Sequence, residues 1–167
     1  MHSLSKREIH DVTNHIIKNW PTNSIGSVKN MQAYVIDGNK RLLVADSLLA
    51  IQLAPDLIIP HLAHHDLLNH FASVQVDMNA VKFVCNGANI MRPGITKFGT
   101  FKESEIVLVK DQIHNKELAV CLSRIDDVNA RAMKNGVVLN NMHHVGDTYW
   151  EMKKTIRIWG LDQKKDW

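Results

Sequence analysis

The segment from residue 76 to residue 94 combines a carboxylate, cationic side chains and glycine turns. Asp77 directly precedes a predicted helix of about two turns, whose first N–H groups its carboxylate can cap. Asn86-Gly87 predicts the end of that helix, because glycine adopts the left-handed conformation that side chains resist. Pro93-Gly94 fits a type II turn. The two turns should leave backbone donors exposed, so that a phosphate or an unstacked base can approach closely.

Two alternatives stay open for these residues. The glycines can equally well serve only to permit a compact barrel. A catalytic carboxylate is the sharper interpretation of Asp77, but nothing nearby supplies a base or nucleophile, so we expect a helix cap. The chain also lacks a P-loop, Gly-x-Gly-x-x-Gly, Gly-x-Ser-x-Gly and His-Glu-x-x-His. We therefore predict no catalytic residue and no cofactor.

The N-terminal part reads as a small α/β arrangement. Ser5 and Glu8 fit a capping box, which predicts a helix from Lys6 to Asn19 with one apolar face. The other expected elements are a β-hairpin of 31–36 and 40–45 around Asp37-Gly38, and a second helix over 61–71 with Pro60 near its start.

From residue 74 onward the pattern changes to short strands with turn signals between them, which suggests a small β-barrel of mixed topology. No Pro/Gly/Ser-rich linker separates the two parts, so a tight junction is expected and the fold class is α+β. The expected strands are Val74–Asp77, Ile90–Arg92, Glu105–Lys110, Glu117–Ile125 and Val137–Met142, with a helix over Asp126–Asn135 closed by Gly136.

Composition indicates a globular protein, with 167 residues of which 45% are apolar and 22% charged. The net charge of +3 lies entirely in the C-terminal part: residues 1–74 hold six Lys/Arg and six Asp/Glu, and residues 75–167 hold fourteen and eleven. This excess points to a polyanionic partner. No secretory leader is visible and polar residues interrupt the apolar run 42–60, so we expect a cytoplasmic protein outside the membrane. Cys85 and Cys121 read as reduced core thiols.

The segment resembles the signature of the PUA domain, in which an Asp-x-Gly-Ala helix leads to an Asn-Gly-Ala turn and a Pro-Gly turn. Gly87–Gly94, Gly-Ala-Asn-Ile-Met-Arg-Pro-Gly, is similar to the malignant T-cell-amplified sequence family and its archaeal relatives. Asn141–Lys153 also looks like that family's C-terminal motif. The resemblance implies a small α/β pre-PUA domain at 1–73, packed on a PUA pseudo-barrel of mixed strands and short helices at 74–155, and a tail at 156–167. One departure is Asn79, where the family has glycine.

What the resemblance implies is RNA binding without catalysis, on tRNA or small-subunit ribosomal RNA, with a second translation factor as a further partner. Three cations of the expected surface, Lys82, Arg92 and Lys97, would neutralise phosphates. An RNA-modification enzyme, or its RNA-binding subunit, is one alternative, although the N-terminal part leaves little room for a catalytic domain. A protein adaptor with a vestigial RNA surface is another. The expected RNA-binding residues are Lys82, Gly87, Ala88, Asn89, Met91, Arg92 and Lys97.

The C-terminal segment interleaves aromatic and basic residues, a pattern that suits stacking on bases and pairing with phosphates. Lys153, Lys154 and Arg157 are its candidate RNA contacts. Alternation over 155–159 equally predicts a strand, with Ile156 and Ile158 packed inward.

Four histidines lie close together in sequence at positions 61, 64, 65 and 70. His61 and His65 would share a helix face, which is a spacing that can ligate a metal ion. No cysteine accompanies them, and we favour a solvated, histidine-rich helix without a metal. The sequence leaves metal binding at His61, His64, His65 and His70 open.

Overall fold

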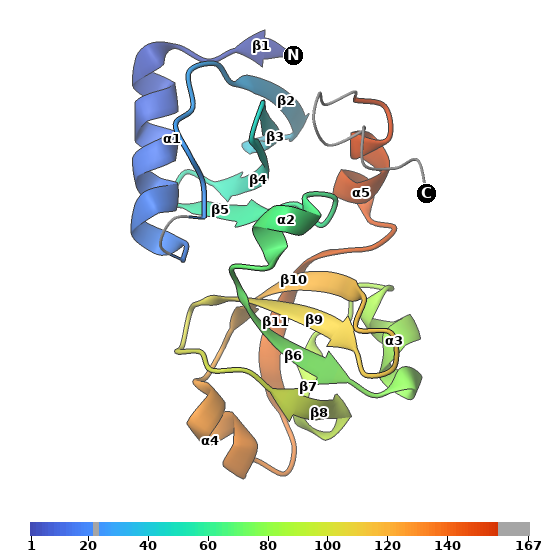
Figure 1. Cartoon of the computed structure of the whole chain (residues 1–167). Helices are drawn as coiled ribbons and strands as arrows, with labels where there is room; N and C mark the ends of the chain where they lie inside the picture. Colours follow the sequence, from blue (N-terminus) through green and yellow to red (C-terminus); the bar gives the residue numbers. More distant parts are fainter. Residues whose placement is uncertain (22–23, 157–167) are drawn as a thin grey trace. The chain divides into compact units, whose positions relative to one another are not determined.

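The computed structural model describes residues 1–21 and 24–156 (Figure 1). It divides into two compact units. Of the described residues, unit 1 comprises those from Met1 to His70 together with residues 151–156, and unit 2 comprises Phe71–Trp150. Within the described ranges, no helix is long and apolar enough to cross a membrane.

Unit 1 is an antiparallel sheet with one long helix (Figure 1). Helix α1 (Lys6–Asn19) has the predicted capping box, in which Ser5 Oγ accepts from Glu8 N and Glu8 Oε2 accepts from Ser5 N. Its end is fixed by Trp20, whose indole N–H donates to the Ile58 carbonyl at 2.9 Å. The strands, in both sequence and spatial order, are β1 (His2–Ser3), β2 (Gln32–Asp37), β3 (Lys40–Ala45), β4 (Leu48–Ala54) and β5 (Leu57–Pro60).

The predicted hairpin is present as β2 and β3, but the sequence did not reveal β4 and β5. Residues 48–51 of β4 are all fully buried, so the strand lacks the alternation that marks a half-buried strand. The expected helical role of Pro60 is wrong: Pro60 is the last residue of β5, paired with Ala50. Because β5 is an edge strand, proline can stand there without removing an inner ladder bond. The helix expected over 61–71 shrinks to α2 (His65–Leu68).

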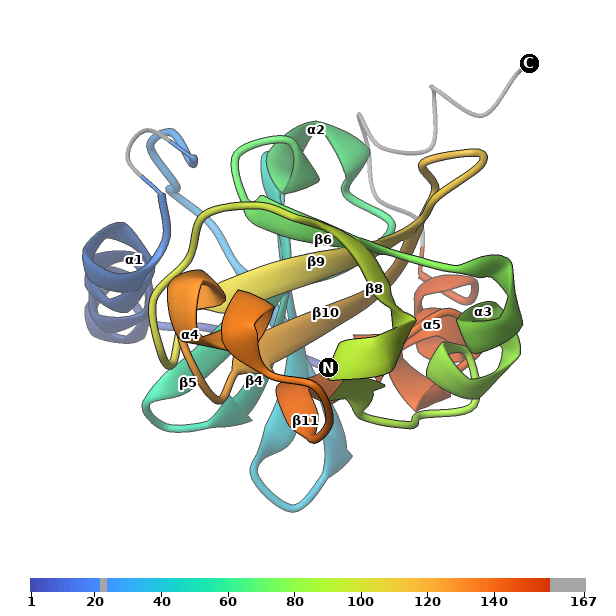
Figure 2. The ribbon, with the colours of Figure 1, turned by 90° about the horizontal axis from the view of Figure 1, so that it is seen from below.

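Unit 2 is a curled six-stranded sheet in the spatial order β7-β11-β10-β9-β6-β8. Every pair is antiparallel except β6 with β9, which is parallel. Figure 2 shows α3 and α4 at opposite ends of β9 and β10. The elements are β6 (Ala72–Val76), α3 (Met78–Val84), β7 (Ile90–Met91), the 3₁₀ turn η1 (Arg92–Gly94), β8 (Ile95–Phe98), β9 (Ile106–Asp111), β10 (Glu117–Ser123), α4 (Asp127–Ala132) and β11 (Val137–His144). A further helix, α5 (Thr148–Lys153), begins in this unit and ends in unit 1.

The core of unit 2 consists mainly of β-branched and small residues. Its members on the central strands are fully buried, as at Val76, Val109 and Ala119. Both cysteines are free. Burial raises the pKa of the Cys121 thiol, which keeps it neutral and unreactive. This sheet, with the sheet of unit 1, confirms the α+β fold class and the mixed-strand pseudo-barrel.

The type II turn expected at Pro93-Gly94 is wrong. Arg92–Gly94 forms one turn of 3₁₀ helix, and Gly94 does not have the positive φ that a type II turn requires. Its carbonyl accepts from Asp77 N at 3.0 Å, and the N–H of Arg92 donates to the Gly136 carbonyl at 2.8 Å. A Cβ at position 94 would lie in ordinary contact, 3.5 Å from Ala80 Cβ. Hydrogen bonds to Asp77 and to Gly136 therefore hold this turn.

Candidate nucleic-acid interface

Helix α3 is capped at both ends by the residues that the sequence singled out. Asp77 Oδ1 accepts from Ala80 N at 3.0 Å, which satisfies a free donor at the helix start. At the other end Gly87 has φ +94°, the left-handed conformation. The predicted cap and the predicted glycine turn are both confirmed.

The turn after α3 uses its own backbone donors. The N–H of Gly87 donates to the Val84 carbonyl at 3.1 Å, and the N–H of Ala88 donates to the Phe83 carbonyl at 3.0 Å. This is the pair of bonds of a Schellman motif. Asn86 N also donates to the Phe83 carbonyl. The expectation that these turns present free N–H groups to an anion is therefore wrong for residues 86–88, because closing the helix end consumes them.

A histidine from β11 closes the glycine turn on one side. A Cβ at position 87 would lie 3.3 Å from His144 Nε2, so a side chain there would press on the imidazole. The Nδ1 of the same ring lies 2.9 Å from the Val145 carbonyl. A carbonyl can only accept, so Nδ1 carries the proton and Nε2 of the neutral ring is an acceptor. His144 lies in the segment Asn141–Lys153 that resembles the family's C-terminal motif, but no role was predicted for its side chain.

Asn141 fastens the glycine turn to β11. Its side-chain amide donates to the carbonyls of Val84 and Ala88, both at 3.0 Å. Its backbone N–H donates to Asn89 Oδ1 at 3.0 Å. The amide oxygen of Asn89 is thus engaged within the fold. The turn is held in one conformation by a residue more than fifty positions away in sequence.

Two of the three predicted phosphate-binding cations are exposed. Lys82 lies on α3, with its ammonium nitrogen 5.1 Å from the centre of the Phe83 ring. Lys97 lies on β8, an edge strand of the sheet. Long exposed ammonium groups of this kind can neutralise phosphates without fixing a sequence.

Arg92 is held by the protein and is not an open cation. Its guanidinium donates to the carbonyls of Ile95 and Arg131, both at 3.3 Å, and lies 5.0 Å from the Phe98 ring centre. Arg131 approaches the same ring at 5.5 Å. These contacts brace η1 against α4 and β8. They limit the contribution that Arg92 could make to a phosphate contact.

The remaining predicted contacts follow one another along the chain. Ala88 and Asn89 are exposed, and Met91 is 47% exposed on β7. Asn79 lies within α3 and is exposed, without an unusual φ. The sequence-based prediction also omitted Phe83, which is 57% exposed on α3. Its signal was its position next to Lys82 on the outer face of a short helix.

The C-terminal candidates behave differently from one another. Lys153 is 5% exposed, which does not fit the expected contact between its ammonium and a phosphate. Lys154 is exposed and pairs with Glu151 at 3.0 Å. Arg157 lies outside the described residues. Of the strand expected over 155–159, Thr155 and Ile156 are described, and they form a turn and a bend; Ile156 is buried as expected.

The histidine segment does not form the expected solvated helix. His61 and His64 precede α2 and are buried. His61 Nδ1 accepts from Ala63 N at 2.9 Å, and His64 Nδ1 accepts from Leu49 N at 3.4 Å. The ring nitrogens thus help to hold the chain after β5. Across residues 1–21 and 24–156, no group of three or more His, Cys, Asp or Glu residues is placed to hold a metal ion.

A buried histidine–aspartate pair holds the junction of β11 and α5. His143 is fully buried, with Nδ1 2.8 Å from Asp147 Oδ2. Asp147 also accepts from the N–H groups of His144 and Trp150. Burial lowers the pKa of His143, and the bond to Asp147 only partly offsets it. Burial alone would raise the pKa of Asp147, but the hydrogen bonds that it accepts outweigh this and lower it.

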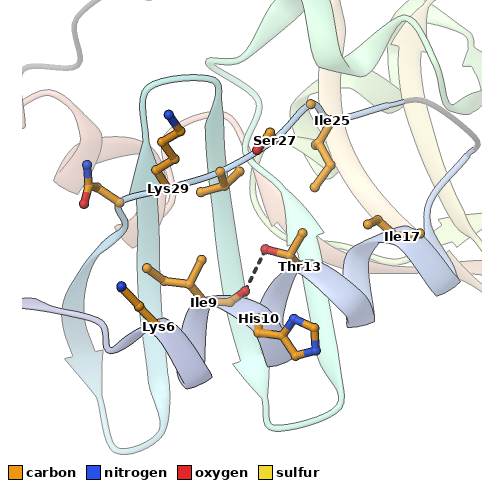
Figure 3. Close-up of a pocket in the computed structure, with 11 residues that line it drawn as sticks. Lys6, Ile9, His10, Thr13, Ile17, Ile25, Ser27 and Lys29 are labelled. Atoms are coloured by element: carbon orange, nitrogen blue, oxygen red, sulfur yellow. Dashed lines mark hydrogen bonds between the residues drawn. The ribbon is translucent and has the colours of Figure 1, made fainter.

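Unit 1 carries a groove of about 860 Å³ between α1 and the segment 25–30 (Figure 3). Apolar side chains line it, including Ile9, Ile17 and Ile25. Lys6 and Lys29 lie at one end, on opposite sides (Figure 3). Ile17 is 64% exposed, which is unusual for a large aliphatic side chain on an amphipathic helix.

Residues 72–145 match the family model of the PUA domain, and this part of the chain is a PUA domain. The chain is also 36% identical over 81 residues to an uncharacterized protein of Methanocaldococcus jannaschii, covering 48% of this chain and 50% of that protein. It is 32% identical over 116 residues to Translation machinery-associated protein 20 of Eremothecium gossypii, covering 64% and 63%. Malignant T-cell-amplified sequence 2 of Mus musculus is 34% identical over 83 residues, covering 47% and 46%. The family resemblance drawn from the motifs is confirmed by these names.

Solved structures share the fold. A hypothetical protein from Pyrococcus horikoshii superposes with a TM-score of 0.76 at 21% identity, covering 90% of this chain and 98% of that one. A PUA-domain protein from Aeropyrum pernix gives a TM-score of 0.76 at 18% identity, covering 92% and 90%. The chain spans half the length of the Methanocaldococcus relative and less than two thirds of the Eremothecium one.

Proposed function

We propose that this protein is a non-catalytic RNA-binding protein of the translation apparatus. The observation that carries the proposal is the PUA domain at 72–145, with the exposed Lys82 beside the braced glycine turn. The relatives named Translation machinery-associated protein 20 support a role in translation. The RNA-facing surface consists of α3, the glycine turn and β7, with Lys97 on β8 adding a cation. Arg92 supports this surface through its contacts within the protein.

The RNA is tRNA or small-subunit ribosomal RNA, and the protein acts in the cytoplasm. This follows from the resemblance to the malignant T-cell-amplified sequence family and from the excess of Lys/Arg in residues 75–167. We retain the domain bounds 1–73 and 74–155 with a tail from 156 as part of the proposal.

A protein partner, here a second translation factor, would use the groove beside α1. Apolar anchors in the groove and Lys6 and Lys29 at one end suit a segment that presents apolar side chains next to acidic ones. Pull-down after nuclease treatment, with Ile17→Asp as the variant, tests this contact. Loss of the partner upon nuclease treatment alone would show that RNA bridges the two proteins.

The affinity for tRNA and for small-subunit RNA, measured at several salt concentrations, tests the main proposal. We expect binding that weakens with salt, because cations on the surface displace counterions from the RNA. Combining Lys82→Ala with Lys97→Ala should flatten the salt dependence by about two in the log–log slope. Lys134→Ala, which removes an exposed cation of unit 2 in the segment after α4, is the matched control. No binding at low salt, or a slope unchanged in the double variant, would contradict the assignment. A modified nucleoside in tRNA incubated with the protein would overturn the non-catalytic part.

A further inference from the structure

An aromatic ring stands in solvent beside the glycine turn. Phe83 is 57% exposed, while Val84, the next residue of α3, is 3% exposed and belongs to the core. The Phe83 backbone is fixed, because its carbonyl accepts from Asn86 N at 3.1 Å and from Ala88 N at 3.0 Å. The ring is therefore presented from a rigid point of the fold.

A cation lies over this ring. The Lys82 ammonium nitrogen lies 5.1 Å from the Phe83 ring centre, within the range of a cation–π contact. A nucleotide joins a flat base to a phosphate, so one ring and one neighbouring ammonium match its two parts. This charge complementarity favours a nucleotide over an apolar peptide at this position.

Asn79 lies one helical turn before Phe83 on α3. Residues four apart are neighbours on a helix surface, so the Asn79 amide is near the ring. An amide can donate to and accept from the edge of a base.

We propose that Phe83 is a stacking platform for one unpaired base of the bound RNA. Lys82 neutralises the phosphate of that nucleotide, and the Asn79 amide contacts the base edge. The inference rests on the proposed function and sharpens its substrate class: bases inside a duplex are already stacked, so the RNA must offer an unpaired nucleotide. A fully paired stem would offer no free base to the Phe83 ring.

The test compares two RNA hairpins with the same stem, one blunt and one with a short unpaired extension. Base stacking on an aromatic ring contributes about 1–3 kcal/mol, so Phe83→Ala should weaken binding of the extended RNA about five- to 150-fold. Its binding to the blunt hairpin should not change, and Phe83→Trp should keep the wild-type preference. Val128→Ala, which truncates an exposed apolar residue on α4, is the matched control.

A fluorescent base analogue in the extension reports on stacking directly. Its emission would not respond if Phe83 had only a structural role. Its emission should be quenched by the wild-type protein and not by Phe83→Ala. Lys82→Ala should lower the slope of log affinity against log salt by about one, whereas Phe83→Ala should leave the slope unchanged. Asn79→Ala should reduce the difference in affinity among the four bases at the stacked position about two- to tenfold.

The two possible failures are distinct. If wild-type protein binds neither hairpin at low salt, nor tRNA and small-subunit RNA, the proposed function fails. If it binds both hairpins equally, or if Phe83→Ala keeps the preference for the extended RNA, the stacking inference is overturned while the proposed function stands.

Discussion

His144 Nε2 lies 3.3 Å from the point that a Cβ on Gly87 would occupy. Two separate features therefore favour glycine at position 87. One is its φ of +94°, and the other is the imidazole that lies against it. The first requirement is local and the second comes from β11. Together they fix the end of α3, which carries Lys82 and Phe83.

Gly87→Ala should destabilise the protein by about 1–3 kcal/mol, because alanine at positive φ is strained and its methyl group contacts the imidazole. Urea unfolding followed by circular dichroism measures the change. Gly146→Ala is the matched control, since Gly146 has φ +87° but no atom within 4 Å of the place where a methyl group would lie. The cost at Gly87 should exceed the cost at Gly146, and His144→Ala should remove the excess. Equal costs at the two glycines would contradict the contact.

Asn141→Ala should cost about 1–3 kcal/mol and should also weaken RNA binding, because the carbonyls of Val84 and Ala88 lose the Asn141 amide as a donor. The Val84 carbonyl keeps its bond from the N–H of Gly87. Asn140→Ala, at the preceding position of β11, is the control. The Asn140 amide oxygen accepts a hydrogen bond from the exposed Arg124. Unfolding and RNA affinity are measured for both variants. Equal effects of the two substitutions would show that Asn141 does not hold the turn.

The sequence allowed the prediction of α1, the β2–β3 hairpin and the capped α3, because each has a signal within a few residues. It did not reveal β4 and β5, whose burial on both faces removes alternation. At the site, Gly87 could be predicted from its turn chemistry. The bond from Arg92 to the Arg131 carbonyl could not be predicted, because it depends on two segments 39 residues apart meeting in the fold.

Arg92→Ala should lower the melting temperature, whereas Lys82→Ala and Lys97→Ala should leave it nearly unchanged. Arg92 supports two carbonyls and an aromatic ring, and the two lysines are exposed. Differential scanning fluorimetry of the three variants, alongside salt-dependent RNA affinities, separates the roles. If Arg92→Ala keeps the wild-type melting temperature but loses much of its RNA affinity, Arg92 contacts the RNA directly and this account of its role is wrong.

Stability should fall as the pH drops below about 6.5, and His143 should account for part of this. Its pKa in the folded protein lies below the usual value, so the unfolded chain binds a proton first and acid favours unfolding. The slope attributable to His143 is at most about 1.4 kcal/mol per pH unit. The lowered pKa of Asp147 has the same sign, with its stabilisation lost below about pH 4.

Urea unfolding of wild type and His143→Gln at pH values from about 7.5 to about 5 measures this contribution, because the range spans the usual histidine pKa. The variant should show a shallower fall in unfolding free energy than the wild type. Parallel curves for the two proteins would show that His143 is not the group responsible.

RNA binding to the outer face of α3, the glycine turn and β7 is the central claim. Titration of a structured RNA with an unpaired extension into isotope-labelled protein, followed by backbone amide NMR, tests it directly. We predict the largest shifts at residues 79–91 and at Lys97, with little change along α1. Shifts confined to unit 1, or none at low salt, would contradict the claim.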